Sequence, residues 1–176
     1  MRIVISGVVA SILGTAILVA ETTPPKPGPE HKRLERGVGQ WNYQGEAKAS
    51  PMGPAGKITG SDTCELFQGG FAVVCRSKGS GPKGPMTGLN VTSYDEGRKA
   101  YTYYAISSQG DNIFVRGTIK GNVWTFEDTM DVEGKPMKIR ATVTEESPTA
   151  NVFKLEAGPA DGQMMVIEEG KSTKVK

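Results

Sequence analysis

The sequence has few of the side chains on which catalytic and metal sites depend. Of its 176 residues, one is a histidine (His31) and two are cysteines (Cys64 and Cys75). Zinc sites need clustered Cys and His ligands, and nucleophilic triads need a histidine beside the nucleophile. The acidic residues are too scattered to suggest a catalytic carboxylate pair. We therefore predict no catalytic residue, no metal and no cofactor, and expect that the protein is not an enzyme.

The sequence also lacks an excess of charge of either sign. The formal net charge is +2, and acidic and basic residues are mixed along the chain. Nucleic acids and anionic membrane surfaces attract strongly basic proteins or basic segments. Neither is therefore expected as a partner, and the sequence does not identify a protein partner.

Residues 1–20 have the pattern of a secretory signal peptide. Arg2 precedes an apolar run from Ile3 to Ala20, and the composition changes sharply at Glu21. The alternative is a retained membrane anchor, because about 20 apolar residues span a bilayer. We predict cleavage, with no membrane span remaining, and a periplasmic or extracellular location.

Residues 21–29 contain four prolines and predict an extended linker. Residues 30–176 then form a single domain. Glu30 to Arg36 allows only a short helix, ended by Gly37 or Gly39. Trp41 follows directly, and we expect it to plug one end of the fold.

After Trp41 the helical periodicity disappears. Short β-rich runs alternate with clusters of Gly, Pro, Asn and Asp, which is typical of all-β sandwiches and barrels. The fold class we predict is all-β: an up-and-down antiparallel β-barrel of about ten strands with a short N-terminal helix.

The cysteines flank the clearest hairpin. Gly69-Gly70 favours a two-residue turn, and centring the turn there places Cys64 directly opposite Cys75. Opposed Cα atoms in an antiparallel ladder are about 4.5–5.5 Å apart, within disulfide range. In an exported protein we expect a disulfide, the alternative being two buried thiols.

Residues 78–87 are rich in glycine and proline and predict a flexible loop. The stretch has the glycines of a phosphate-binding loop but not its Lys-Ser/Thr ending. The loop is either a lid over the barrel mouth or a solvated excursion.

Two further turns fix the register of three strands. Centring them at Gly121-Asn122 and Glu133-Gly134 places Arg116 opposite Glu127, and Glu127 opposite Arg140. One face of the three strands is then polar and the other apolar. A one-residue slip would invert every side chain, so the agreement supports this register.

Asp128 interrupts the apolar face. Its predicted neighbours are Val115 and Ile139, so the carboxylate should point inward, where burial is costly unless the group is hydrogen-bonded, paired or wetted. It is either an aspartate near a barrel end, satisfied by backbone or water, or a polar anchor in a ligand cavity.

With these residues in place, the chain resembles the calycin superfamily of lipid-binding β-barrels. Gly39-Gln40-Trp41 after a short helix is similar to the Gly-X-Trp motif that opens the lipocalin barrel. The chain more specifically resembles the uncharacterised, mostly bacterial family known as domain of unknown function 1579. The matching features are Leu34, Gly39-Gln40-Trp41, Gly69-Gly70, Gly88, Tyr94-Asp95, Tyr101 and Gly170-Lys171. Nitrobindin-like relatives bind haem through a late histidine that this sequence lacks, which argues against haem.

The resemblance and the residue patterns together predict an exported, non-enzymatic barrel that binds a small hydrophobic or amphipathic ligand inside. The alternative is a cell-envelope interaction or structural protein whose barrel is filled by side chains. Cavity size separates the two, since pockets for drug-sized ligands measure roughly 300–1,000 Å³. The ligand-binding residues we predict are Trp41, Val115, Ile119, Trp124, Phe126, Asp128, Ile139 and Ala141.

Overall fold

A computed structural model describes residues 25–132 and 134–175. The predicted signal peptide and the first residues of the predicted linker lie outside these ranges. Within them, neither helix is long and apolar enough to cross a membrane.

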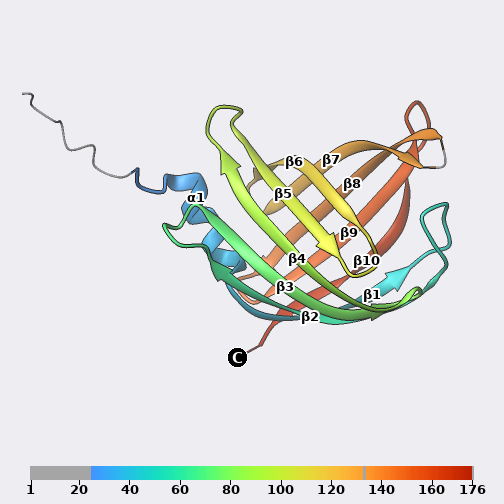
Figure 1. The fold of residues 1–176 in the computed structure, drawn as a ribbon, viewed down its shortest axis with the longest axis horizontal. Coiled ribbons are helices and arrows are strands. Elements are labelled where there is room, and N and C mark those ends of the chain that lie inside the picture. Colours follow the sequence, from blue (N-terminus) through green and yellow to red (C-terminus); the bar gives the residue numbers. More distant parts are fainter. Residues whose placement is uncertain (1–24, 133, 176) are drawn as a thin grey trace, which may run out of the picture.

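A short helical segment precedes ten strands (Figure 1). The helical part comprises α1 (Pro29–Arg33) and a 3₁₀ turn, η1 (Leu34–Gly37). The strands are β1 (Gly39–Ala47), β2 (Gly56–Leu66), β3 (Ala72–Gly81), β4 (Gly84–Asp95), β5 (Ala100–Ser107), β6 (Asn112–Lys120), β7 (Val123–Val132), β8 (Lys135–Ser147), β9 (Ala150–Pro159) and β10 (Met165–Lys174).

The strands form a closed up-and-down barrel, which confirms the predicted fold class. Each strand pairs antiparallel with the next in sequence, and β1 also pairs with β10. Trp41 thus lies between Asp62 of β2 and Lys174 of β10. Closure pairs each strand with two neighbours, although β6 and β7 pair only over Arg116–Lys120 and Val123–Glu127.

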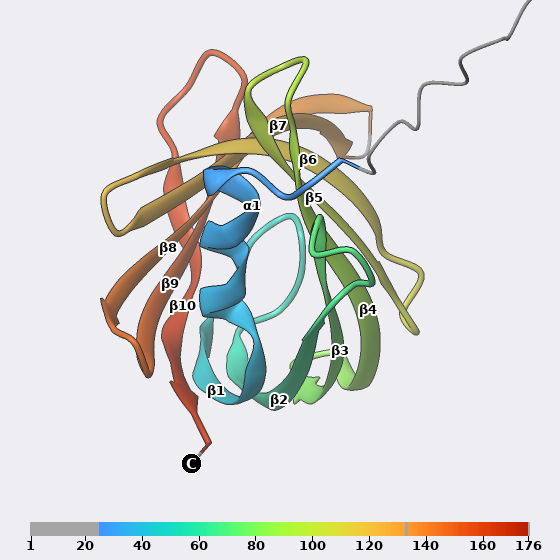
Figure 2. The ribbon, with the colours of Figure 1, turned by 90° about the vertical axis from the view of Figure 1, so that its left-hand side faces the viewer.

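The helical segment lies across one end of the barrel (Figure 2). The segment ends at Gly37, one of the two predicted ends, but only Pro29–Arg33 is α-helical and the remainder is a 3₁₀ turn. Leu34 is 2% exposed and Trp41 5% exposed, and both belong to the core cluster at this end. The Trp41 Nε1–H donates to the Gly37 carbonyl at 2.9 Å. Trp41 therefore packs beneath the helical segment, as the plug prediction requires.

The cysteine hairpin has the predicted register. Cys64 is paired with Cys75, and Leu66 with Val73. The two cysteines form a disulfide with Cα atoms 4.0 Å apart, which confirms the predicted pairing.

The prediction of a flexible loop at residues 78–87 is wrong. β3 and β4 continue through this stretch as a regular ladder and are joined by Pro82 and Lys83 alone. Gly84 has a φ of +96°, which suits glycine at the turn. Gly79 has a different purpose, because a Cβ at that position would lie 2.2 Å from the Tyr43 hydroxyl. Gly79 therefore leaves space for Tyr43 and Gly84 allows the tight turn, and neither glycine belongs to a flexible loop.

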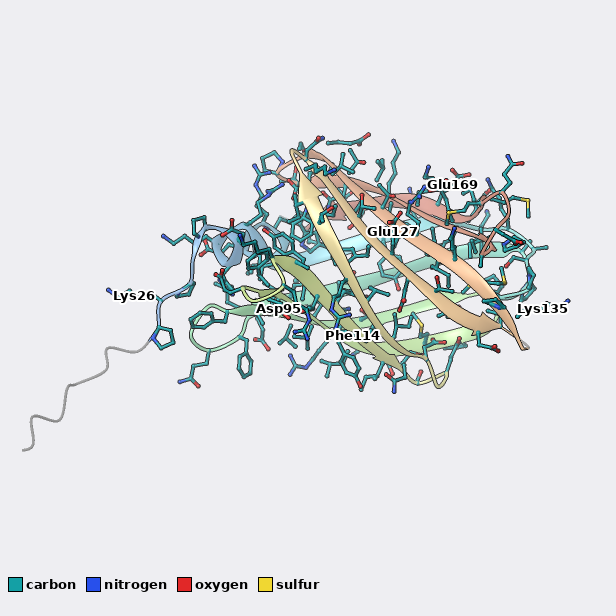
Figure 3. The ribbon with its side chains drawn as sticks, turned by 90° about the horizontal axis from the view of Figure 1, so that it is seen from above. Lys26, Asp95, Phe114, Glu127, Lys135 and Glu169 are labelled. Atoms are coloured by element: carbon teal, nitrogen blue, oxygen red, sulfur yellow. A yellow bond between two sulfur atoms is a disulfide. The ribbon has the colours of Figure 1, made fainter. Side chains whose placement is uncertain are left out.

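The register of β6, β7 and β8 is confirmed. Arg116 is paired with Glu127, and Glu127 with Arg140. The Arg140 Nε–H donates to Glu127 at 2.5 Å on the outer surface, where Figure 3 labels Glu127. Arg116 instead lies over the Phe114 ring, 4.9 Å from its centroid.

Candidate functional site

The barrel contains a cavity of about 680 Å³ that is partly open to solvent. Its lining runs from Leu34 and Trp41 at the helical end to the opposite rim, where the connections between strands contribute Met52, Pro54 and Lys83. The barrel therefore has a plugged end and a far rim that the cavity reaches.

One side of the cavity is apolar. The side chains here come from strands on both sides of the β1–β10 junction and from β7 and β8. Phe126, Val143 and Leu155 are half-buried, because each packs against the wall on one side and faces the cavity on the other. The apolar lining comprises Trp41, Ile58, Val73, Trp124, Phe126, Val143, Phe153, Leu155 and Ile167.

Polar side chains line the wall formed by β2, β3 and β4, beside the apolar Ile58 and Val73. The Ser77 hydroxyl donates to Asp62 Oδ1 at 2.5 Å, and Asn90 Nδ2 donates to Ser77 Oγ at 3.5 Å. These three residues come from β2, β3 and β4, and all three line the cavity.

Besides Glu145, two carboxylates line this cavity, Asp62 and Glu168. Burial raises the pKa of Asp62, and the hydrogen bond from Ser77 offsets only part of this effect. Burial likewise raises the pKa of Glu168 on β10. Within residues 25–132 and 134–175, neither carboxylate forms an ion pair.

Two tyrosines lie close to Asp62. Burial, with the Asp62 charge adding to it, raises the pKa of Tyr103 to about 12. Burial also raises the pKa of Tyr43, with the charges of Asp62 and Glu168 acting in the same direction. Both tyrosines line the cavity. Tyr43 lies across Gly60 and Gly79, where a Cβ would come within 2.3 Å and 2.2 Å of its hydroxyl oxygen.

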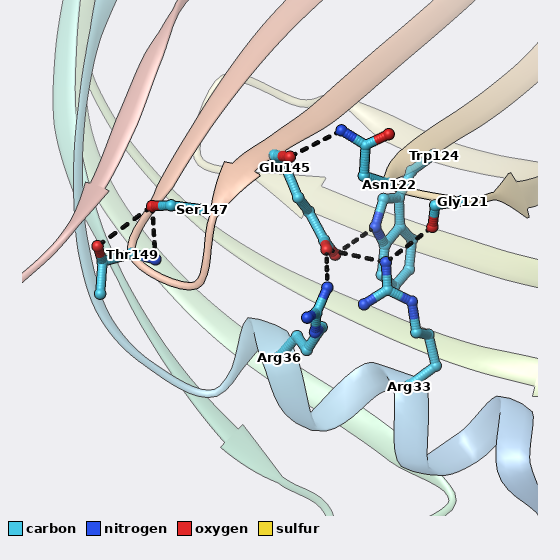
Figure 4. Close-up of polar contacts among 8 residues, drawn as sticks. All are labelled: Arg33, Arg36, Gly121, Asn122, Trp124, Glu145, Ser147 and Thr149. Carbon is cyan, nitrogen blue, oxygen red and sulfur yellow. Dashed lines mark hydrogen bonds and ion pairs between the residues drawn. The ribbon is translucent and has the colours of Figure 1, made fainter.

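Glu145 of β8 fastens the helical segment to the barrel (Figure 4). It accepts hydrogen bonds from Trp124 Nε1 at 2.7 Å, from Arg33 at 2.8 Å and from Arg36. Burial alone would raise the pKa of Glu145, but these donors more than offset it and hold the pKa below its usual value. Arg33 also donates to the Gly121 carbonyl at 3.2 Å.

The predicted ligand-binding residues divide into two groups. Trp41, Trp124 and Phe126 line the cavity, whereas Val115, Ile119, Ile139 and Ala141 are not part of its lining. Ile119 packs against the core cluster at the helical end. Ala141 lies between Phe126 and Leu155 in the ladder, and both larger side chains extend further into the barrel.

Asp128 also lies away from the cavity lining. It is paired with Ile139 as predicted, but its side chain is exposed, and Oδ1 accepts the Thr129 backbone N–H at 2.7 Å. The β6–β7 ladder ends at Arg116 and Glu127, so Val115 has no partner in β7. The hydrogen bond from the Thr129 N–H agrees with the first alternative, an aspartate satisfied by backbone. The exposed side chain differs from the buried, inward carboxylate that the alternation predicted.

Sequence reasoning missed the polar side of the cavity. The signal for Asp62 was present, because extending the Cys64–Cys75 ladder by two residues pairs Asp62 with Ser77 on the same inward face. Glu168 gave no comparable signal, since it follows a register shift between Val166 and Glu168. Across the described ranges, no three His, Cys, Asp or Glu side chains are grouped so that they could hold a metal ion.

Comparison with solved structures supports the barrel fold. One similar structure is the crystal structure of Rv2717c from M. tuberculosis, with 11% identity and a TM-score of 0.61, covering 85% of this chain and 99% of that chain. Another is the S-type phycobiliprotein lyase CPES from Guillardia theta, with 9% identity and a TM-score of 0.57, covering 85% and 99%. At such identities the likeness concerns the fold alone.

No curated protein matches the sequence. Residues 26–174 match the family described as "Protein of unknown function (DUF1579)". That match spans the helical segment and all ten strands, and it confirms the family indicated by the sequence motifs. The chain therefore belongs to the DUF1579 family.

Proposed function

We propose that the protein is an exported, non-enzymatic β-barrel that binds a small hydrophobic or amphipathic molecule in its interior. The single observation that carries this proposal is the cavity of about 680 Å³. Its volume lies within the roughly 300–1,000 Å³ of pockets for drug-sized ligands. A barrel filled by its own side chains would not leave this space.

The composition of the lining supports an amphipathic ligand. Aromatic and aliphatic side chains, including Phe126, Val143 and Leu155, cover one side, and Asp62, Ser77 and Asn90 lie on the other. Ligand pockets are usually mainly apolar, with a few placed polar groups that fix orientation. The fold adds support, because calycin-like barrels commonly bind small hydrophobic ligands.

Export is supported by the disulfide between Cys64 and Cys75. Disulfides form and persist in oxidising compartments and are rare in the cytosol. The apolar run at residues 3–20 is the matching sequence feature.

The proposal is tested with the apolar fluorophore N-phenyl-1-naphthylamine. The wild type should bind it with increased fluorescence, and Leu155→Trp, which places a larger side chain in the cavity, should weaken binding about tenfold, or about 1.4 kcal/mol. Val152→Trp is the matched control. Val152 lies on the same strand as Leu155, β9, but is not part of the cavity lining. Equal binding by wild type and Leu155→Trp would place the probe elsewhere and contradict the proposal.

A second function, interaction through the outer surface, is favoured by one observation. Val74, Val91, Tyr104 and Phe114 are paired in succession across β3 to β6 and face outward. Tyr104 is 40% exposed and Phe114, labelled in Figure 3, is 46% exposed. Exposed apolar patches often mark interaction sites. A Tyr104→Ser/Phe114→Ser variant should then lose cross-links to envelope proteins while retaining probe binding; unchanged cross-links would exclude this function.

A further inference from the structure

The cavity contains negative charge that no neighbouring cation neutralises. Asp62 is bonded to the Ser77 hydroxyl, and Glu168 makes neither an ion pair nor a side-chain hydrogen bond within the described ranges. Both carboxylates belong to the cavity lining. A buried carboxylate is costly unless it is paired, hydrogen-bonded or reached by water. The interior is therefore short of positive charge.

Of the three basic residues that line the cavity, Arg36 and Lys48 are already engaged, and Lys83 is the third. Arg36 is bound to Glu145 beneath the helical segment. Lys48, at the far rim, forms an ion pair with Glu169 at 2.7 Å. Lys174 lies over the Trp41 ring, 5.2 Å from its centroid.

Lys174 does not reach Asp62 because Trp41 lies between them in the ladder. Lys83 is exposed at the turn between β3 and β4, on the far rim. The basic groups thus lie at the rim and at the helical end, and the acidic groups on the inner wall.

Two tyrosine side chains lie near the Asp62 carboxylate. Tyr43 and Tyr103 are close enough to Asp62 for its charge to raise the pKa of each phenol. The Tyr103 hydroxyl makes no hydrogen bond to any described residue, although burial is the largest cause of its raised pKa. Its ring lies 5.8 Å from that of Phe126, on the apolar side. A carboxylate with aromatic side chains nearby in one cavity is suited to organic ammonium ions, which aromatic rings also attract.

We propose that the cavity binds an amphipathic organic cation, with its protonated amine or quaternary ammonium against Asp62, Tyr43 and Tyr103 and its apolar part against the wall of Trp124, Phe126 and Leu155. This inference rests on the proposed ligand-binding function and specifies the class of ligand. Ser77 and Asn90 hold the Asp62 carboxylate in place. Glu168 is a second acidic contact, on the β10 side of the barrel.

An anionic ligand fits this cavity less well than a cationic ligand. A carboxylate or phosphate group placed on the polar side would face Asp62 and Glu168 with no cation to neutralise it. A neutral ligand would leave Asp62 uncompensated or protonated. An anionic ligand could use only Lys83 and Lys48 at the rim, which leaves the polar interior without a role.

The test uses three probes with the same tail: decyltrimethylammonium, 1-decanol and decanoate, each below its aggregation concentration. Binding is measured by calorimetry and by Trp fluorescence. Wild type should bind the cation at least tenfold more tightly than decanol or decanoate. Asp62→Asn should reduce affinity for the cation at least tenfold and leave decanol binding unchanged.

A matched variant acts as the control. Glu46→Gln removes an exposed carboxylate on the outer face of β1 and should change none of the three affinities. Folding of each variant is checked by its melting temperature.

Proton release gives an independent readout. Decyltrimethylammonium cannot titrate, so protons released on binding at about pH 5 must come from the protein. The titratable groups near Asp62 are Tyr43 and Tyr103, beside uncharged Ser77 and Asn90, and neither tyrosine titrates near this pH. Glu168 also lines the cavity. Calorimetry in buffers of different ionisation enthalpy should show proton release by wild type and less by Asp62→Asn.

The outcomes separate this inference from the proposed function. Equal affinity for all three probes, or unaltered cation binding by Asp62→Asn, overturns the cation inference and leaves interior binding standing. Tighter binding of decanoate that depends on Lys83 also overturns it. Binding of none of the probes, or of N-phenyl-1-naphthylamine, overturns the proposed function itself.

Discussion

Asp62 is the residue on which the chemistry of the cavity depends. Its carboxylate is held by Ser77 but lacks a positive partner, so burial raises its pKa above the usual value of 3.8. Such a group lowers the stability of the ligand-free protein at neutral pH. Such a carboxylate suits a binding site for a cation, because a bound positive charge would remove this loss of stability.

Asp62→Asn should therefore stabilise the ligand-free protein at pH 7. The folded state binds the Asp62 proton more tightly than the unfolded state, so wild-type stability falls as pH rises from 3.8 to the raised pKa. Asn keeps an acceptor for Ser77 without the charge, and we expect a gain of about 1 kcal/mol, or about 2–4 °C in Tm. Below pH 3.8 the two proteins should melt alike. Thermal melts across this range check the result, and a less stable variant at pH 7 would contradict it.

Gly79 illustrates how a small residue shapes the cavity. A Cβ there would lie 2.2 Å from the Tyr43 hydroxyl and 2.7 Å from the Thr59 carbonyl oxygen. We expect Gly79→Ala to cost about 1–3 kcal/mol in the free energy of unfolding, through strain. At Gly81 the nearest atom, Ile58 Cγ2, is 3.3 Å away, so Gly81→Ala should cost less. Urea unfolding compares the two, and equal losses would show that Tyr43 does not determine the need for glycine.

At the scale of elements, the helical segment depends on one acidic residue of the barrel wall. Glu145 accepts from Arg33, Arg36 and Trp124, which joins the segment to β7 and β8. Ion pairs that are half-buried and share hydrogen bonds contribute more than exposed ones. The segment is therefore fixed as a plug and does not act as a mobile lid.

Glu145→Ala should cost about 2–3 kcal/mol, because it leaves Arg33 and the Trp124 N–H without their acceptor. Glu127→Ala, which breaks the exposed pair with Arg140, should cost about 0–1 kcal/mol. Since the pKa of Glu145 is lowered, its contribution is complete above pH 4.5 and is lost as pH falls through the folded-state pKa. Urea unfolding at several pH values checks this, and equal costs for both variants would contradict it.

The sequence predicted elements well where a turn and two alternating faces agreed. Gly69-Gly70 and Gly121-Asn122 fixed ladders that the structure confirms at Cys64–Cys75 and Arg116–Glu127. The prediction of a flexible loop at 78–87 was wrong because the sequence does not distinguish a glycine that leaves space for Tyr43 from a glycine in a loop. The contact that distinguishes them joins β1 to β3 and exists only after folding.

The site was harder to predict than the fold. The alternation of polar and apolar residues correctly predicted that Trp124 and Phe126 point inward. It could not show which of the inward residues line the cavity. That depends on relative size across neighbouring strands, as with Ala141 between Phe126 and Leu155. It also depends on the pairing of β1 with β10, which is a long-range contact without a local turn.

At the scale of the whole molecule, the barrel has a plugged end and an interior cavity. A row of apolar side chains, Val74, Val91, Tyr104 and Phe114, lies on its outer surface. The plug and the disulfide lie at one end, with Cys64 in the same core cluster as Leu34 and Trp41. The cavity of about 680 Å³ extends from there to the far rim. Interior binding and outer-surface binding are thus physically separate and can be distinguished by where a ligand makes contact.

The most direct measurement is isotope-filtered NMR of the protein with 1-decanol. Interior binding predicts nuclear Overhauser contacts between the decyl chain and the methyl groups of Val143, Leu155 and Ile167, which line the cavity. Contacts confined to Val74, Val91 and Ile106 on the outer face, or no contacts at all, would contradict the claim that the barrel interior is a binding site.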